Sequence, residues 1–242
     1  MAEAKTREWR IQQNSGWGTA AMKPVTRIVD PNRSFAVQAR HDYHRGFMSY
    51  RYVVTTDMPF VNAVADERYI FKGGNCLDIQ MARIVGRDEE GVRIIEDPMR
   101  FLVTTQEGKP KVMFYRKTVE DIEQLQPFTF QSPTGEERFD LVKDVSDLVG
   151  VHLTGVDGGF AVEVTIPDSL YNFGFKHLHV AGRQDFALDV GYIFGNREGD
   201  QATGRFYWSN NGFAANILND IPNESRLVPE EWGTGLLVGI EE

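Results

Sequence analysis

Apolar and polar residues alternate along short stretches of this chain, and turn-forming residues separate the stretches. Ser34–Arg40 places Phe35, Val37 and Ala39 on one face, as expected for a strand with one side in a core. The same period of two recurs at Phe47–Val54, Cys76–Val85, Arg100–Thr105, Lys111–Arg116, Val151–Thr154, Phe160–Ile166, Asp185–Phe194 and Arg205–Ser209. The pattern predicts short β-strands along most of the chain.

Several breaks between these strands have the composition of hairpin loops. Gln106–Pro110 and Gly155–Gly159 each join two consecutive strands, and Gly195–Asp200 joins two more. A helix is predicted only at Thr118–Leu125, where Thr118 and Asp121 have the spacing of a capping box. About ten short strands without a long amphipathic helix predict an all-β fold, an antiparallel two-sheet sandwich of the jelly-roll or immunoglobulin type.

The alternation also predicts which side chains form the core. We expect one domain over residues 1–242, with 1–31 as a candidate N-terminal extension, because no linker or change of composition divides the chain. The predicted core residues are Phe35, Val37, Leu77, Ile79, Phe101, Phe139, Val162, Val164 and Ile166.

The composition leaves the predicted fold unchanged but argues against several classes of partner and site. The chain is 41% hydrophobic and 25% charged, with a formal net charge of −9, which is typical of a globular protein and disfavours nucleic acid as a partner. No apolar run approaches the roughly 18 residues that span a bilayer. The single cysteine, Cys76, excludes an internal disulfide, and its apolar strand predicts a buried and unreactive thiol.

The strongest local signal lies at Gly204–Asp220, where an alternating strand ends in Trp208, Ser209 and amide side chains. A pyranose ring has an apolar face and a rim of hydroxyl groups, so an exposed indole beside amides suits it. This interpretation makes Trp208 a stacking platform and Asn210 a hydrogen-bonding partner. The alternative, which stays open, places Trp208 in the core of the sandwich.

Other side chains are placed to complete such a site. The guanidinium of Arg51 can bind paired hydroxyls or a carboxylate, with an ion pair inside the protein as the alternative. Tyr43 and His44 form a polar turn just before the strand of Arg51. Trp17 lies in the glycine-flanked segment Ser15–Gly18, where it either faces a ligand or packs on its own N-terminal segment.

Oxygen-bearing side chains gather on the loop that follows Trp208. Asn219, Asp220 and Glu224 lie at short spacing, and Asp189 is a candidate from a neighbouring strand. Carboxylate and amide oxygens are the ligands that calcium prefers, although the spacing is not that of an EF-hand. We therefore predict a structural calcium ion here, with a hydrogen-bonded turn as the alternative.

Signals for catalysis are weaker. Asp78 and Glu163 interrupt apolar strands and are the candidates for the two carboxylates of a glycosidase, but the sequence does not bring them together. The motifs G-x-S-x-G and H-E-x-x-H and a phosphate-binding glycine loop do not occur. Binding is therefore favoured over enzymatic activity.

Four segments together resemble a known family. They are FMSYRYVV at Phe47–Val54, FKGGNCLDIQ at Phe71–Gln80, GFAVEVTIP at Gly159–Pro167 and the Trp208 segment, with Asn62 between the first two. In this order they resemble the family 9 carbohydrate-binding modules and the wider DOMON-like group. The chain departs from the family pattern at Asn75, where an Asp is usual, and at Asp78, where a Glu is usual.

The resemblance implies a β-sandwich that binds a polysaccharide or oligosaccharide without catalysis, as a monomeric module of a larger bacterial protein of glycan processing or the cell surface. It adds Asn62 to the ligand-binding candidates, and structural calcium is common in the family. The implied location is extracellular or periplasmic, with the leader absent from this chain. Two alternatives stay open: a hydrolase or lyase on the same scaffold, and a haem b domain using Met48 or Met58 with a histidine among His41, His44, His177 and His179.

Overall fold

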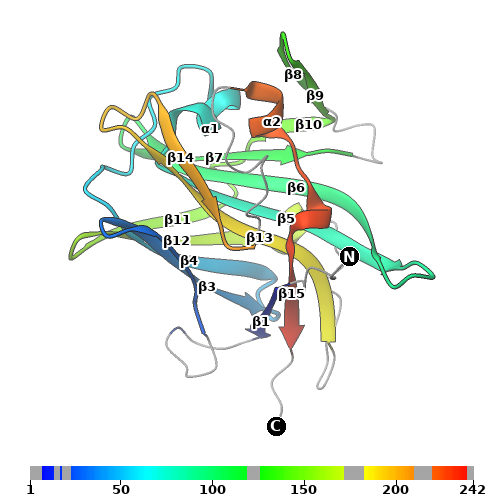
Figure 1. Cartoon of the computed structure of the whole chain (residues 1–242). Coiled ribbons are helices and arrows are strands. Elements are labelled where there is room, and N and C mark those ends of the chain that lie inside the picture. The colour runs from blue at the N-terminus through cyan, green and yellow to red at the C-terminus, as the bar shows by residue number, and fades with distance from the viewer. Residues whose placement is uncertain are drawn as a thin grey trace.

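The structure, a computed structural model, describes residues 7–13, 17, 23–118, 126–171, 183–209 and 220–238. β-strands dominate it, and short helices lie between some of them (Figure 1). The strands are β1 Glu8–Gln13, β2 Val25–Asp30, β3 Arg33–Asp42, β4 Phe47–Thr55, β5 Cys76–Arg87, β6 Arg93–Gln106, β7 Lys109–Arg116, β8 Phe128–Ser132, β9 Gly135–Phe139, β10 Leu141–Asp144, β11 Gly150–Val156, β12 Gly159–Pro167, β13 Arg183–Gly195, β14 Ala202–Tyr207 and β15 Gly233–Val238.

The helical elements are all short. They are η1 Glu67–Tyr69, α1 Ile70–Gly73, η3 Asp168–Leu170, α2 Ile221–Ser225 and η5 Pro229–Glu231. The helix predicted at Thr118–Leu125 lies, apart from Thr118, outside the described residues. Among the described residues, no helix is both long enough and apolar enough to cross a bilayer.

The strands predicted from the alternation are present, and so are the hairpins between them. β6 and β7 pair antiparallel across Glu107 and Gly108, whose φ angles of 50° and 74° are those of a tight two-residue hairpin turn. β11 and β12 pair in the same way across Asp157 and Gly158. Local sequence therefore predicted these hairpins correctly.

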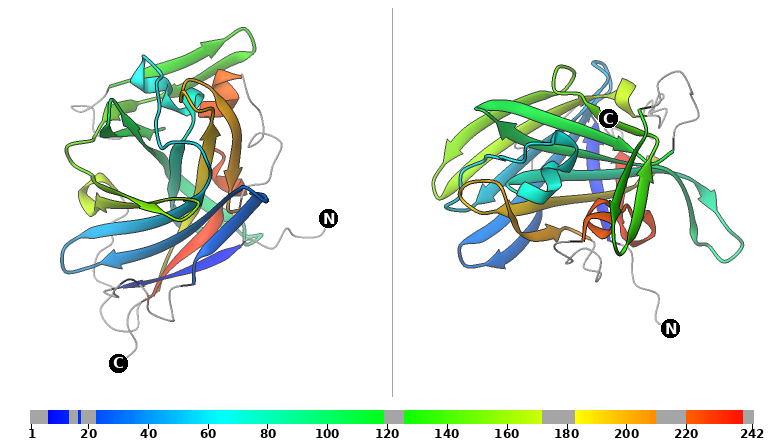
Figure 2. Two further views of the ribbon diagram at one scale, coloured as in Figure 1. Left: turned by 90° about the vertical axis from the view of Figure 1, so that its left-hand side faces the viewer. Right: turned by 90° about the horizontal axis from the view of Figure 1, so that it is seen from above.

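The arrangement of the strands differs from the predicted one. A single sheet of 13 strands runs in the order β10-β7-β6-β5-β13-β15-β1-β3-β4-β12-β11, with β14 paired to β13 and β2 paired to β3, while β8 and β9 form a separate hairpin. β1 is parallel to both β15 and β3, so the sheet is mixed. The sheet curls until β3, β4, β11 and β12 face β5, β6 and β7 (Figure 2).

The prediction of about ten antiparallel strands in two separate sheets is thus wrong in strand number and in strand direction. β1 is the physical reason, because it lies between the last strand and β3 and so joins the two halves into one sheet. Its sequence, EWRIQQ, contains only two apolar residues, which is too short an alternation to identify a central strand. Part of the candidate N-terminal extension 1–31 is therefore built into the sheet.

The space enclosed by the curled sheet holds the main core. It is filled by apolar side chains from both halves, among them Val37, Tyr52, Ile79, Phe101 and Val164. All the core residues predicted from the sequence are buried, because a period of two decides which face each residue occupies.

A second apolar cluster covers the other face of β5, β6, β7 and β13. It contains Phe130 and Phe139 from the β8–β9 hairpin, Phe71 from α1 and Trp232 near the C-terminus, so Phe139 belongs here rather than to the main core. Cys76 is also a member, as a buried free thiol whose pKa is raised by burial and by the nearby charge of Asp78. The second cluster makes β5 and β6 buried on both faces.

Candidate functional site

The outward face of β3, β4, β12 and β11 carries a row of polar side chains around Arg51. Strand register places Gln38, Arg51, Glu163 and His152 opposite one another on successive strands. Arg51 Nε lies 3.6 Å from Glu163 Oε1, and both side chains are more than a third exposed. The ion-pair alternative for Arg51 is therefore realised, but at the surface, where such a pair is weak and can exchange partners.

Trp17 lies over the same outward face. The guanidinium carbon of Arg40 is 4.6 Å from the centre of the Trp17 ring, the arrangement of a cation–π contact. Arg40 is two residues from Gln38 on β3 and therefore projects from the same face as Gln38 and Arg51. The structure thus places Trp17, through its contact with Arg40, on the same sheet face as Arg51.

Tyr43 and His44 lie further away, in the turn between β3 and β4. Their rings meet edge to face at 5.5 Å, and Asp42 accepts a hydrogen bond from the backbone of Arg45 within the same turn. Five residues of strand, roughly 16 Å at ~3.3 Å per residue, separate this turn from Arg51. These two residues lie at the end of the hairpin rather than beside Arg51.

The other predicted ligand residues have different positions. Trp208 is 6% exposed and packs against Trp9 with ring centres 5.7 Å apart, so the structure favours the core alternative and not the stacking platform. Asn62 is buried, and its amide donates to the carbonyls of Ile70 and Gly74. Asn210 lies outside the described residues.

The predicted calcium ligands are spread over several contacts. Glu224 Oε2 is 2.7 Å from Lys72 Nζ, whereas Asp220 accepts hydrogen bonds from Thr134 and Asn223. Asp189 is buried, and its Oδ1 accepts from two backbone N–H groups. Asn219 lies outside the described residues, and within the part that the structure describes no three His, Cys, Asp or Glu side chains form a metal-ion group.

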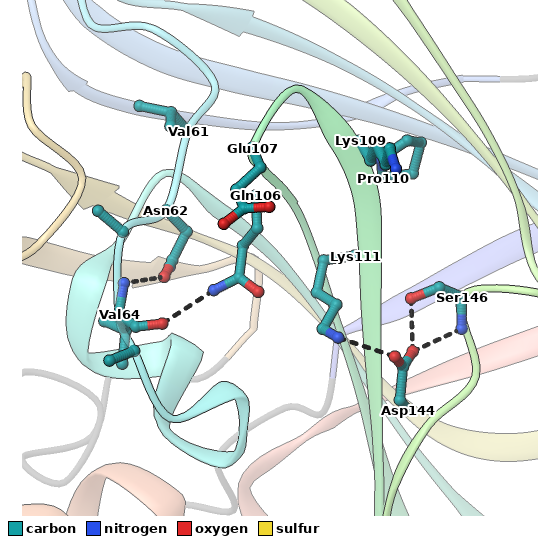
Figure 3. A pocket seen from close by; sticks show the side chains of 12 residues that line it. Val61, Asn62, Val64, Gln106, Glu107, Lys109, Pro110, Lys111, Asp144 and Ser146 are labelled. Carbon is teal, nitrogen blue, oxygen red and sulfur yellow. Dashed lines mark hydrogen bonds and ion pairs between the residues drawn. The ribbon is translucent and has the colours of Figure 1, made fainter.

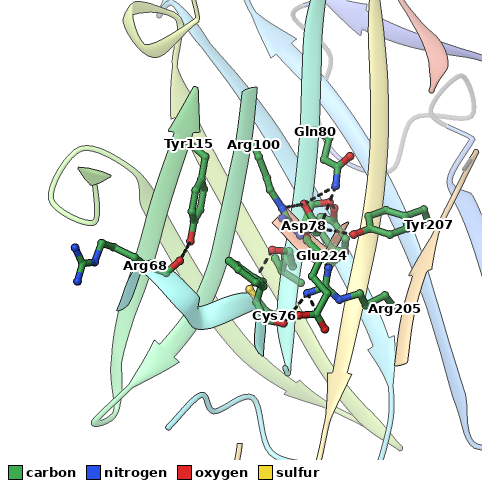
Figure 4. Close-up of polar contacts among 12 residues, drawn as sticks. Arg68, Cys76, Asp78, Gln80, Arg100, Tyr115, Arg205, Tyr207 and Glu224 are labelled. Atoms are coloured by element: carbon green, nitrogen blue, oxygen red, sulfur yellow. Dashed lines mark hydrogen bonds and ion pairs between the residues drawn. The ribbon is translucent and has the colours of Figure 1, made fainter. Parts of the chain in front are cut away.

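Sequence reasoning missed a buried ionic network behind β5 (Figure 4). Arg100 donates to both oxygens of Asp78, at 2.9 and 2.5 Å, and the hydroxyl of Tyr207 donates to Asp78 at 2.7 Å. Arg100 and Arg205 both donate to the backbone carbonyl of Glu224, which ties α2 to the network.

This network has little direct access to solvent. Asp78, Arg100, Arg205 and Glu224 are all buried. The signal in the sequence was the alternation of Asp78 and Gln80 with apolar neighbours, which predicted a polar face but not its partners. Asp78 and Glu163 project from opposite halves of the curled sheet, each on the side away from the main core, so they do not form the carboxylate pair of a glycosidase.

An open groove of about 580 Å³ lies beside the β6–β7 hairpin (Figure 3). Asn62, Gln106, Lys111, Asp144 and Ser146 line part of it. Burial lowers the pKa of Lys111, but hydrogen bonds to Asp144 and Glu67 outweigh that effect and leave its pKa raised. Lys111 is already paired, and none of the described residues that line the groove is aromatic. In the described part of the chain the groove therefore offers hydrogen-bonding groups without a stacking surface.

The similarity of this chain to known proteins is found in the fold. A scan against family models and a search of curated proteins find no match. Among solved structures, the chain is similar to a family 9 carbohydrate-binding module from Caldicellulosiruptor kristjanssonii in complex with glucose, at 10% identity, 98% coverage of each chain and a TM-score of 0.50. It is also similar to a family 9 module from the same organism in complex with cellotriose, at 8% identity and a TM-score of 0.50. This match covers 98% of the present chain and 96% of the cellotriose-bound chain. The fold is therefore that of the class which the sequence motifs resemble.

Proposed function

We propose that this chain is a non-catalytic carbohydrate-binding module whose site is the outward face of β3, β4 and β12. The observation that carries the proposal is the placement of Trp17 and Arg51 over one exposed sheet face. Gln38 and Glu163 flank Arg51 there, so donors and acceptors surround the guanidinium. An aromatic ring next to such a row suits a sugar, which has one apolar face and a rim of hydroxyls.

The chemistry of this face predicts weak and reversible binding. Arg51 can donate to two neighbouring hydroxyls of a sugar, while Glu163 can accept from a third. A ligand on an open face stays largely solvated, so we expect a Kd on the order of micromolar to millimolar. The two similar structures are complexes with glucose and with cellotriose, which makes neutral glucose oligomers the first ligands to test.

Two accompanying proposals concern the setting of the module. We propose that it works outside the cytoplasm as part of a larger bacterial protein that processes or displays glycans, on the strength of its resemblance to carbohydrate-binding modules. We also propose a structural calcium ion near Asn219, Asp220 and Glu224, on the strength of their oxygen chemistry. Fractionation of cells producing the parent protein tests the first, and chelation tests the second.

Titration with cellotriose, followed by tryptophan fluorescence and calorimetry, tests the proposed site. Trp17→Ala and Arg51→Gln should each weaken binding about tenfold, as expected when ~1.4 kcal/mol of contact energy is lost. Arg83→Gln is the matched control, because Arg83 is similarly exposed, pairs with Glu96 across β5 and β6, and lies on the other half of the sheet. Unchanged cellotriose affinity in the Trp17→Ala, Arg51→Gln double variant would refute the site.

A further inference from the structure

A second open cavity, of about 710 Å³, lies at the end of the molecule where the β2–β3 and β13–β14 turns meet. We call it the Arg33 pocket. The residues that define it are Asp30, Arg33, Asp57, Met58, Phe194 and Arg197. Its volume lies in the range of sites that hold a molecule the size of one or two sugar rings.

Arg33 belongs to the opposite face of β3 from Gln38 and Arg40. It alternates in phase with Phe35 and Val37, whose side chains fill the main core, but it stands at the first residue of the strand, where the core ends. Its guanidinium carbon lies 5.4 Å from the ring centre of Phe194. The Arg33 pocket is therefore separate from the sheet face that carries Arg51.

The guanidinium of Arg33 has two partners within the pocket. Its Nε donates to Asp30 Oδ2 at 2.7 Å, and its guanidinium carbon lies over the ring of Phe194. The hydrogen bond from Arg33 lowers the pKa of Asp30, so this carboxylate stays ionised and keeps holding Nε. The two terminal nitrogens donate to no described residue, which leaves the end of the fork free for a bidentate ligand.

A second cation and apolar groups complete the Arg33 pocket. Arg197 lies 3.8 Å from Asp57, but the side chains are 64% and 74% exposed, so this ion pair is weak and Arg197 can turn to a ligand. Met58 and Pro31 add apolar surface to the lining. The β13–β14 turn forms one side of the pocket and is held at two points. Asn196 and Asp200 are joined by hydrogen bonds within the turn. Gly195 packs so closely against Gly73 and Gly74 that a Cβ would not fit.

From this arrangement we propose that the Arg33 pocket binds a hexuronic acid, as the acidic residue of a glycan. The carboxylate would take the free end of the Arg33 fork, and the apolar ring face would lie on Met58 and Pro31. The terminal nitrogens of Arg33 are donors, and a carboxylate accepts from them more strongly than a hydroxyl does. This inference rests on the proposed carbohydrate binding, but it uses different residues from the sheet face.

The test is calorimetric titration of the whole chain with D-glucuronic acid and, separately, D-glucose. We expect glucuronic acid to bind at least about tenfold more tightly than glucose, and Arg33→Gln to remove that preference because it keeps a polar side chain but loses the charge and the guanidinium fork. Arg83→Gln, from an equally exposed ion pair elsewhere, should leave the affinity for glucuronic acid unchanged. Equal binding by wild type and a folded Arg33→Gln variant would overturn the proposal.

A second variant and a competition experiment complete the test. If Arg33→Gln unfolds, Met58→Glu places a like charge in the pocket without touching the Asp30–Arg33 pair, and it should abolish glucuronic acid binding; full retention would overturn the proposal. Competition by acetate as strong as that by glucuronic acid would also overturn it, because the sugar ring would then contribute nothing. A wild-type protein that binds glucuronic acid but not cellotriose would refute the sheet-face site, whereas a wild-type protein that binds cellotriose but not glucuronic acid would refute the Arg33 pocket.

Discussion

Asp78 carries a carboxylate on a strand that is buried on both faces, and its neighbours are arranged to hold that charge. Arg100 binds it with two nitrogens, and Tyr207 and Gln80 donate to it as well. Burial by itself would lower the pKa of Arg100, but the charge of Asp78 reverses this effect and leaves the pKa raised, so Arg100 stays charged. A buried pair of this kind contributes little compared with apolar residues of equal size, yet removing one partner leaves an uncompensated charge.

Arg100→Met should therefore lower the free energy of unfolding by about 3–5 kcal/mol, since it leaves Asp78 buried without its cation. The double variant Arg100→Met, Asp78→Leu should lose much less than the sum of the single variants, because it removes both charges together. Urea unfolding followed by circular dichroism measures all three. Strictly additive losses would show that the two side chains are not coupled.

At the scale of elements, the junction of β13 and β14 depends on the absence of a side chain. Gly191 pairs with Tyr207 on β14 and with Asp78 on β5. A Cβ at Gly191 would lie 2.3 Å from the ring of Tyr207, which is far inside a normal contact. The glycine thus lets the tyrosine ring lie flat on β13, where its hydroxyl reaches Asp78.

Gly191→Ala should destabilise the protein by about 1–3 kcal/mol through overpacking. Gly155→Ala is the matched control, because Gly155 also lies in a strand but a Cβ there would meet no atom within 4 Å. We expect the control to change stability by less than about 0.5 kcal/mol. Thermal melts of the two variants make the comparison, and equal melting temperatures would contradict the packing argument.

At the scale of the whole molecule, one curled sheet gives the chain three distinct surfaces. Its enclosed side holds the main core, the outward side of β5–β7 and β13 is covered by the second cluster, and the outward side of β3, β4, β12 and β11 is open. Among the residues that the structure describes, this open side is the one that presents a broad strand surface to a large ligand. This is why the proposed glycan site is placed there.

The calcium proposal is also tested on the whole molecule. An ion that binds only the native state raises the unfolding temperature, so the protein should melt at a higher temperature in calcium than in EDTA. Magnesium at the same concentration is the control, because it favours a smaller octahedral site. If EDTA and calcium give the same melting temperature, the loop at Asn219, Asp220 and Glu224 is a hydrogen-bonded turn.

The sequence by itself determined the all-β class of the fold, the main hairpins and the burial of the alternating apolar strand residues. These properties depend on local rules: successive strand residues point to opposite faces, and turn residues select hairpin geometry whatever the rest of the chain does. The exposed position of Arg51, opposite Tyr50 and Tyr52 in the core, follows from the same rule. The position of Trp17 beside Arg40 on the same face does not.

Only the tertiary structure decided which strands are neighbours and which polar side chains are in contact. β1 pairs with β15 although the two strands are far apart in the sequence, and no local pattern predicts such a pairing. Trp208 is buried because Trp9 and Gly233 pack against it. Arg100 meets Asp78, and Arg33 meets Phe194, through contacts between distant segments, and such contacts depend on the register and curl of the complete sheet.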